Sequence, residues 1–209
     1  LLEPTDQRIQ AGCLGNIVAH LTFHGRSGHS ARPWLAESAI EKAAYGLLPL
    51  FAMEPRIASV EGLEFREVVS VTRLESGIAD NVIPAEATAT LNLRYPPDRD
   101  PHEAEEYLRS IVPEGATLQI VSHASAGRVV TDSPLVRALR DSGDLVLEPK
   151  QAWTNVADFT ANGIDAVNFG PGHTAYAHRQ DERVEISALV GAYEILHRFL
   201  TRPMREDAA

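Results

Sequence analysis

The sequence predicts a mixed α/β protein in which one small α+β domain interrupts an α/β layer that is itself incomplete. Alternating apolar residues predict half-buried strands over 16–23, 68–74 and 86–94. Helix-capping signals precede two amphipathic segments that begin near residues 38 and 100. These elements follow one another in β-α-β-β-α-β order, whereas the elements left over on either side are too few to enclose a core.

The two helices of the interrupting domain are predicted from their first turns. Ser38 and Glu41 have the spacing of a capping box, and apolar residues recur after them with a helical period. Asp100 can cap the second helix, because Pro101 takes the favoured first helical position after it. A short strand over 116–121 then completes a ferredoxin-like order of elements.

The same pattern sets the expected domain boundaries. We assign residues 16–122 to the ferredoxin-like domain, and residues 1–15 and 123–209 to the partial α/β domain. The segment "LLEPTD" at residues 1–6 is interpreted as the end of a buried strand, and "DAVNF" at 165–169 as another strand.

Two helices are expected in the partial domain. The first begins at Ser133, a cap followed by Pro134, and ends at Gly143. The second covers about 187–200, after the loop that follows the strand at 165–169.

Composition narrows the class of protein. With 44% hydrophobic and 23% charged residues, the sequence has the profile of a soluble globular protein. A formal net charge of -10 without a basic cluster excludes nucleic acid and anionic membrane as expected partners. No apolar run approaches the roughly 20 residues of a membrane span, and the start lacks a signal-peptide pattern, so we expect a cytoplasmic protein. Because Cys13 is the single cysteine, a metal would have to use His, Asp and Glu.

A histidine-bearing loop follows the predicted strand at 165–169. "GPGHTAYAHRQDE" contains His173 and His178, and imidazole is the commonest protein ligand for a metal such as zinc. Asp181 and Glu182 follow His178 and could orient its ring. Spacing alone does not choose between the two histidines, and a role outside metal binding fits either one.

Three further candidates lie in the ferredoxin-like domain. His29 stands in a loop with two glycines, where an exposed imidazole could face a substrate or simply lie at the surface. Asn81 lies in a turn, which asparagine often stabilises through its backbone contacts. Arg94 ends a strand and could bind a carboxylate with its guanidinium fork, although a solvated arginine is common there.

The partial domain offers three more candidates. Glu3 precedes Pro4 and, by itself, is an ordinary strand-end glutamate. Thr154 and Asn155, in "WTNVADF", are polar groups at the mouth of the same layer. A capping or turn role is the simpler interpretation of this pair.

Five stretches, taken together and in order, resemble the M20 family of zinc aminoacylases and carboxypeptidases. They are "LLEPTD", "GHSARPWLAESAIEKAA", "NVIPAEATATLNLRY", "WTNVADF" and "NFGPGHTAYAHRQDERVEI". The resemblance implies a di-zinc exopeptidase-like catalytic domain, incomplete in this chain, and an inserted ferredoxin-like lid that also forms the homodimer.

The resemblance also implies roles for individual residues and a cofactor. Two zinc ions, or cobalt as the alternative metal, would occupy the active site of the intact enzyme. The implied metal ligands are Glu3 and His178, the implied catalytic residue is His29, which would stabilise an oxyanion, and the implied substrate-binding residues are Asn81, Arg94, Thr154 and Asn155. Family members commonly carry aspartate in place of Asn155 and arginine in place of Asp158.

The reaction implied by the resemblance is hydrolysis of the amide bond of a small N-acyl amino acid. The expected substrate is N-succinyl-LL-2,6-diaminopimelate, cleaved to succinate and LL-diaminopimelate in lysine and diaminopimelate biosynthesis. Alternatives are deacetylation of an acetylornithine-like substrate, dipeptide cleavage, or a non-catalytic chain that only dimerises. Because the family's remaining metal ligands and general base would lie before Leu1, we expect the chain to be a fragment that is inactive by itself.

Overall fold

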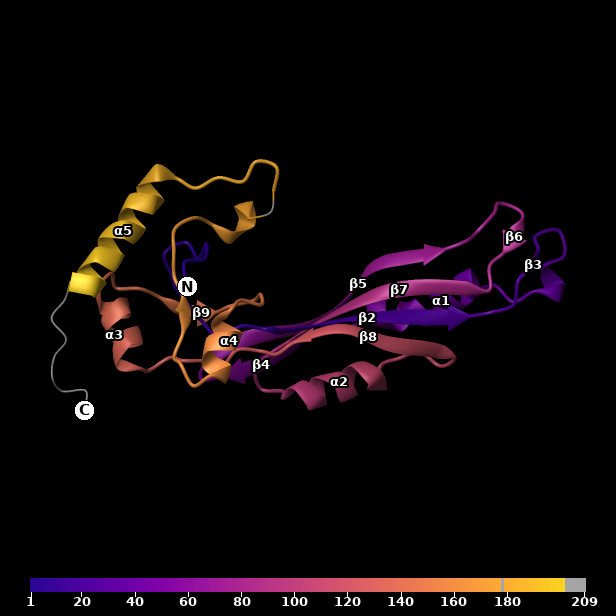
Figure 1. Cartoon of the computed structure of the whole chain (residues 1–209), viewed down its shortest axis with the longest axis horizontal. Helices are drawn as coiled ribbons and strands as arrows, with labels where there is room; N and C mark the ends of the chain where they lie inside the picture. The colour runs from indigo at the N-terminus through magenta and orange to yellow at the C-terminus, as the bar shows by residue number, and fades with distance from the viewer. Residues whose placement is uncertain (178, 202–209) are drawn as a thin grey trace. The chain divides into compact units, whose positions relative to one another are not determined.

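The computed structural model describes residues 1–177 and 179–201, and the chain divides into two compact units (Figure 1). Unit 1 comprises Leu1–Leu14, Ser59–Phe65 and Ala126–Ala209. Unit 2 comprises Gly15–Ala58 and Arg66–Ser125. The mixed α/β class predicted from the sequence is confirmed.

A five-stranded sheet, counted over the described residues, forms most of unit 2, although the end of β4 and the start of β5 fall in the segment Ser59–Phe65 of unit 1. Its strand order is β4-β5-β7-β2-β8, and each neighbour of β7 and β2 runs antiparallel to it. Without β4, the order β5-β7-β2-β8 is the ferredoxin-like arrangement that the sequence predicts. The strands are β2 (Gly15–His24), β4 (Arg56–Val60), β5 (Leu63–Ser76), β7 (Glu86–Tyr95) and β8 (Ala116–Ala124).

The two faces of this sheet differ in polarity. On β2, alternate residues from Ile17 to Phe23 are buried, whereas His20 points from the opposite face and is exposed. Helix α1 (Ala39–Phe51) covers the buried face, because Gly46 lies so close to Phe23 that a Cβ there would be 2.5 Å from its ring. Such one-sided burial is typical of antiparallel sheets.

Helix α2 (Pro101–Ser110) packs on the same face of the sheet, beside β8 in Figure 1. Its Glu105 contacts His123 Nδ1 at 2.9 Å, and His123 pairs in register with Ile17, a residue of the buried face. The Tyr95 hydroxyl lies 2.7 Å from the other ring nitrogen of His123.

Both predicted helix caps of unit 2 are confirmed. Ser38 Oγ accepts a hydrogen bond from the backbone N–H of Glu41 at 3.2 Å. Asp100 and Glu103 form a complete capping box, with bonds of 2.8 and 2.9 Å. These side chains satisfy backbone donors that have no partner inside their helices.

A buried acid joins several parts of unit 2. Glu67, only 2% exposed, accepts hydrogen bonds from Arg56 and Arg99, with shortest distances of 2.9 and 2.7 Å. Asp98 also accepts from Arg56 at 2.7 Å, and the Arg99 guanidinium stacks over the Tyr107 ring at 4.6 Å. Burial raises the pKa of Glu67, but the two arginines outweigh that effect and leave the pKa below its ordinary value.

Unit 1 contains a small sheet and three α-helices within its described residues. The strand order is β10-β1-β9, in which β1 is parallel to β9 and antiparallel to β10. The strands are β1 (Ile9–Ala11), β9 (Leu147–Pro149) and β10 (Val167–Asn168), and the helices are α3 (Pro134–Asp141), α4 (Val156–Ala161) and α5 (Ile186–Thr201). A core cluster joins β1, α3 and α5 through Ile9, Leu139 and Ile195.

No strand is assigned to residues 1–6, but Leu1 exchanges backbone hydrogen bonds with Val167 and Phe169, as the last residue of a strand would. The chain then turns sharply. Pro4 has no N–H to donate, and Asp6 has a φ of +54°, a left-handed backbone that no strand allows. The strand of this region begins later, at Ile9.

No helix in residues 1–177 and 179–201 has both the length and the apolar character that crossing a membrane requires.

Candidate functional site

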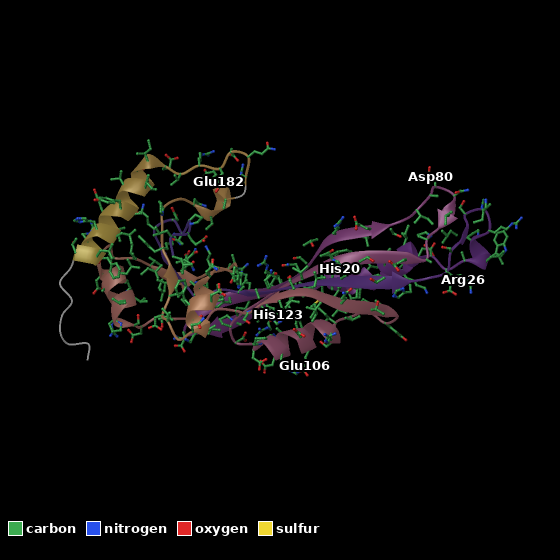
Figure 2. All side chains as sticks on the ribbon, viewed as in Figure 1. His20, Arg26, Asp80, Glu106, His123 and Glu182 are labelled. Atoms are coloured by element: carbon green, nitrogen blue, oxygen red, sulfur yellow. The ribbon has the colours of Figure 1, made fainter. Side chains whose placement is uncertain are left out.

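His29 and Asn81 lie together at one end of unit 2, on a two-stranded ribbon of β3 (Gly28–His29) and β6 (Val82–Ile83). The backbone N–H of Ser30 donates to the Asn81 carbonyl at 3.0 Å. Asp80, the neighbour of Asn81, is labelled at this end in Figure 2 together with Arg26. Two candidates separated by more than fifty residues are thus brought side by side.

The His29 ring is exposed and has a defined hydrogen-bonding state. Its Nδ1 accepts a hydrogen bond from the backbone N–H of Ala31 at 3.1 Å. A neutral imidazole that accepts at Nδ1 carries its proton on Nε2. His29 can therefore present an Nε2–H donor to a ligand.

Close backbone packing fixes the loop that carries His29. Arg26 and Glu37 exchange two backbone hydrogen bonds of 2.9 Å across the loop. A Cβ at Gly25 would lie 2.1 Å from the Glu37 carbonyl oxygen, so no larger residue fits there without movement. The Glu37 carboxylate also pairs with Lys42 at 3.1 Å.

Arg94 lies elsewhere in unit 2, on β7. Its Nε donates to Asn92 Oδ1 at 2.8 Å, and Asn92 in turn donates to Asn16 at 2.8 Å. Burial lowers the pKa of Arg94, and the guanidinium makes no ion pair with a described residue. A partly buried cation with only an amide partner is able to bind a carboxylate.

In unit 1, Glu3 lies against the start of the histidine loop. A Cβ at Gly170 would be 2.5 Å from the Glu3 carbonyl oxygen, so the two backbones are in close contact. Thr5, 1% exposed, accepts from the Gly170 N–H at 3.0 Å and donates to the Arg8 carbonyl at 2.7 Å. These bonds fix the short segment that carries the Glu3 carboxylate.

The histidine loop is described in part. His178 lies outside the described residues. His173 is exposed and caps a short 3-10 helix at 174–176, where its Nδ1 accepts from Ala175 N–H at 3.0 Å. Asp181 pairs with Arg179 and Arg183, at 2.8 and 3.1 Å, and its predicted role beside His178 stays a prediction.

Asn155 is the N-cap of α4, and Thr154 directly precedes it. Thr154 is 6% exposed, and its Oγ1 has no hydrogen-bond partner among the described residues. Its carbonyl accepts from Cys13 Sγ at 3.5 Å. Asn155 takes the N-cap position without a side-chain cap and donates to Asp158 at 2.8 Å instead.

Lys150, directly after β9, is a residue that sequence reasoning missed. It is 5% exposed, and burial lowers its pKa, whereas Glu3, Cys13 and Glu148 act electrostatically in the opposite direction. A lysine is almost never fully buried without a partner. The signal available in the sequence was its place at a strand end, four residues before Thr154.

The described residues do not fit a complete zinc site. Among them, no group of three or more His, Cys, Asp or Glu side chains is placed to hold a metal ion. A catalytic zinc usually needs three protein ligands and a water. Glu3 can supply at most one of these.

Solved structures of similar fold define the class of protein. The chain matches a tripeptidase from Staphylococcus aureus subsp. aureus mu50 with a TM-score of 0.73 and 14% identity, covering 94% of this chain and 54% of that one. It matches an M20 family metallo-carboxypeptidase from Sulfolobus solfataricus with a TM-score of 0.70 and 17% identity, covering 96% and 61%. The fold is therefore that of the M20 peptidases.

Sequence comparison assigns the family. Residues 13–117 match the M20 family description "Peptidase dimerisation domain". A Mycobacterium tuberculosis H37Rv protein with the provisional name succinyl-diaminopimelate desuccinylase is 37% identical over 200 residues, covering 95% of this chain and 56% of that protein. The succinyl-diaminopimelate desuccinylase of Corynebacterium glutamicum is 33% identical over 204 residues, covering 95% and 55%. The chain belongs to the M20 family, and it spans about half the length of these relatives.

Proposed function

We propose that the protein is a zinc-dependent amide hydrolase that removes the acyl group of an N-acyl amino acid. The proposed substrate is N-succinyl-LL-2,6-diaminopimelate, and the products are succinate and LL-diaminopimelate. The observation that carries this proposal is the 33–37% identity, over 95% of this chain, to proteins named as desuccinylases of that substrate. A likeness of fold to tripeptidases and carboxypeptidases would fit several amide hydrolases equally well.

Within this proposal, His29 donates its Nε2–H to the oxygen that becomes negatively charged during amide hydrolysis. The hydrogen bond at Nδ1 supports this role, because it leaves the Nε2 proton free to donate. We assign Asn81 and Arg94 to substrate binding, and Arg94 suits a carboxylate because no described acid pairs with it. Thr154 and Asn155 are assigned to the same role in unit 1.

We assign Glu3 and His178 as metal ligands in the intact enzyme. Among the described residues, no group of three such side chains is placed to hold a metal ion, so Glu3 and His178 are the two ligands that we assign to this chain. Changing His178 to Ala should sharply lower the zinc content, because removing a ligand leaves the ion short of a donor. Changing His173 to Ala should leave zinc in place, since its Nδ1 already accepts a backbone hydrogen bond. Metal analysis of both dialysed variants decides between them, and zinc lost only from the His173 variant would reverse the assignment.

We propose that unit 2 acts as a lid and joins two copies in a homodimer. Helix α1 exposes large apolar side chains, with Tyr45, Leu48 and Phe51 at 73%, 57% and 62%. The sheet also ends at β8, which bonds to β2 alone in this sheet, and open edges are usually paired or protected. Light scattering should show a dimer, and a monomer at high concentration with a folded unit 2 would contradict the proposal.

The activity is tested by measuring succinate release from N-succinyl-diaminopimelate. N-acetylornithine and a dipeptide serve as the competing substrates, and a chelator should abolish turnover of the preferred one. The 209-residue chain alone should be inactive, since its described residues lack a complete zinc site. Zinc-dependent turnover by the homogeneous chain would contradict that expectation, and preference for either competing substrate would replace the proposed one. A protein that needs no zinc and cleaves none of them would be a non-catalytic dimerisation chain.

A further inference from the structure

Lys150 differs from the other lysine of the sequence in how its ammonium is used. Lys42 is exposed, and its Nζ donates to the His24 carbonyl at 2.8 Å and to Glu37 at 3.1 Å. Lys150 is 5% exposed, and among the described residues its Nζ makes neither a hydrogen bond nor an ion pair. The buried lysine is thus the one without a direct partner.

The acids near Lys150 are not direct partners for its charge. The Glu148 carboxylate already accepts hydrogen bonds from Arg8 at 3.0 Å and from Gln10 at 2.7 Å. Glu3 acts on Lys150 electrostatically without forming an ion pair with it. The side chain of Lys150 is thus largely buried, while its ammonium has no hydrogen-bonded anion among the described residues and can accept one more negative group.

A second polar group without a partner lies in the same neighbourhood. The backbone N–H of Lys150 donates to the Ala11 carbonyl at 3.3 Å, and Cys13 Sγ donates to the Thr154 carbonyl at 3.5 Å, so both Lys150 and Thr154 lie beside the same short segment. The Thr154 hydroxyl is buried and has no hydrogen-bond partner among the described residues. An ammonium and a hydroxyl can both donate to the same carboxylate, which accepts at up to four positions.

We propose that Lys150, together with the Thr154 hydroxyl, binds a carboxylate of the substrate. The inference rests on the proposed function for the identity of the ligand, because every N-acyl amino acid carries a carboxylate and a succinyl group adds a second. The two sources share one chemistry, and the substrate analogues described below distinguish them. The alternative occupant is an acidic side chain of the protein, in which case Lys150 would be purely structural.

The first test measures binding of succinate to the purified protein by calorimetry. Lys150→Met should weaken succinate binding about 10- to 150-fold, the range expected for a lost charged hydrogen bond. Lys150→Arg should retain part of the affinity, because it keeps the charge. The matched control Lys42→Met should bind within about twofold of the unchanged protein. Equal affinity in Lys150→Met and the unchanged protein would overturn the proposal.

The second test uses the intact enzyme and compares substrates that differ by one carboxylate. If Lys150 binds the acyl carboxylate, Lys150→Met should lower kcat/KM for the N-succinyl substrate and leave that for the neutral N-butyryl analogue unchanged. If it binds the amino-acid carboxylate, the loss should disappear with the carboxamide analogue. Either pattern supports the proposal, whereas an equal loss with all analogues indicates a structural role and overturns it.

Failure of the proposed function remains distinguishable from failure of this inference. If the intact enzyme hydrolyses none of these substrates, the proposed function is wrong, and succinate binding still decides the role of Lys150. If Lys150→Met does not fold, as judged by circular dichroism, Lys150→Arg and Lys150→Gln are compared in its place. A glutamine that binds succinate as well as arginine does would then overturn the inference.

Discussion

The two units differ in how completely they satisfy their own buried groups. In unit 2, the most buried acid, Glu67, is hydrogen-bonded by two arginines. In unit 1, three buried side-chain atoms lack a partner among the described residues: Gln10 Oε1, Thr154 Oγ1 and Asn168 Oδ1. Unpartnered buried polar atoms are rare in stable interiors. Within the described residues, unit 2 therefore pairs its most buried acid itself, whereas unit 1 leaves three buried polar atoms without a protein partner.

Both units expose apolar side chains, on helix α1 in unit 2 and around a cavity in unit 1. The sheet of unit 2 buries every second residue of β2 and β7 against its own helices. Unit 1 keeps an apolar cavity of about 420 Å³, lined in part by Leu2, Leu135 and Phe159. These three side chains are 76%, 52% and 44% exposed. A small three-stranded sheet and short helices cannot cover that much apolar surface.

The largest expected effect tests the buried acid of unit 2. Glu67→Ala should lower the free energy of unfolding by about 3 to 4 kcal/mol, because it leaves two guanidinium groups without their buried acid. Urea unfolding measures the loss in the free energy of unfolding, and hydrogen exchange of peptides from unit 2 shows that the loss lies in that unit. The control Glu75→Gln removes an exposed ion pair with Arg73 and should cost less than about 1 kcal/mol. Similar losses in both variants would contradict the special role of Glu67.

The stabilising effect of Glu67 should also depend on pH. The folded-state pKa of Glu67 lies below its ordinary value, so its stabilising contribution is present above the ordinary carboxyl pKa of about 4.3. That contribution is lost as the pH falls through the lower folded-state pKa. The stability difference between Glu67→Ala and the unchanged protein should therefore be constant near pH 7 and shrink below about pH 4.

The variant His29→Ala tests whether an exposed side chain of unit 2 takes part in catalysis. In the active enzyme, His29→Ala should lower turnover about 100- to 1000-fold, as expected for loss of one oxyanion donor. The melting temperature and zinc content should not change, because the ring is exposed and accepts one local hydrogen bond. His24→Ala, which removes an exposed ring in contact with Thr117, is the matched control. Near-normal turnover in the His29 variant would leave it as an ordinary surface histidine.

Two buried threonines of unit 1 differ in whether their hydroxyl groups have hydrogen-bond partners. Thr160 Oγ1 accepts from Arg128 N–H at 3.1 Å and contacts the Val156 carbonyl at 2.9 Å, whereas Thr154 Oγ1 has no partner. Thr160→Val should therefore cost about 1 to 3 kcal/mol, because a backbone N–H loses its acceptor. Thr154→Val should change the free energy of unfolding by less than about 0.5 kcal/mol. A large loss from Thr154→Val would mean that its hydroxyl is already satisfied within the folded protein.

The last prediction compares the cost of removing equivalent helix caps in the two units. Ser38 caps α1 in unit 2 and Ser133 caps α3 in unit 1, with hydrogen bonds of 3.2 and 3.3 Å. Each change to Ala should cost about 1 kcal/mol, since each removes one acceptor for a helix N–H. Hydrogen exchange in the first turn of each helix measures both. A cost confined to Ser38 would mean that α3 is not stably folded.

The sequence by itself determined the features that depend on residues close together in the chain, namely strands and helix caps. The alternation on β2 and β7 and the caps at Ser38 and Asp100 were predictable, because period and capping are encoded within a few residues. The motifs around Glu3 and His29 likewise indicated the family. The fifth strand, β4, was missed, because its five residues, with Ala58 alone buried, give too weak a pattern to separate from a loop.

The tertiary structure decided everything that depends on distant segments. It placed Asn81 beside His29 and surrounded Glu67 with two arginines from separate stretches of the chain. It also buried Lys150 without a direct partner, which no local pattern reveals, because the burial of a lysine depends on what the rest of the chain packs around it. Strand order and the pairing of charges follow from long-range packing, and a single sequence records such packing only indirectly.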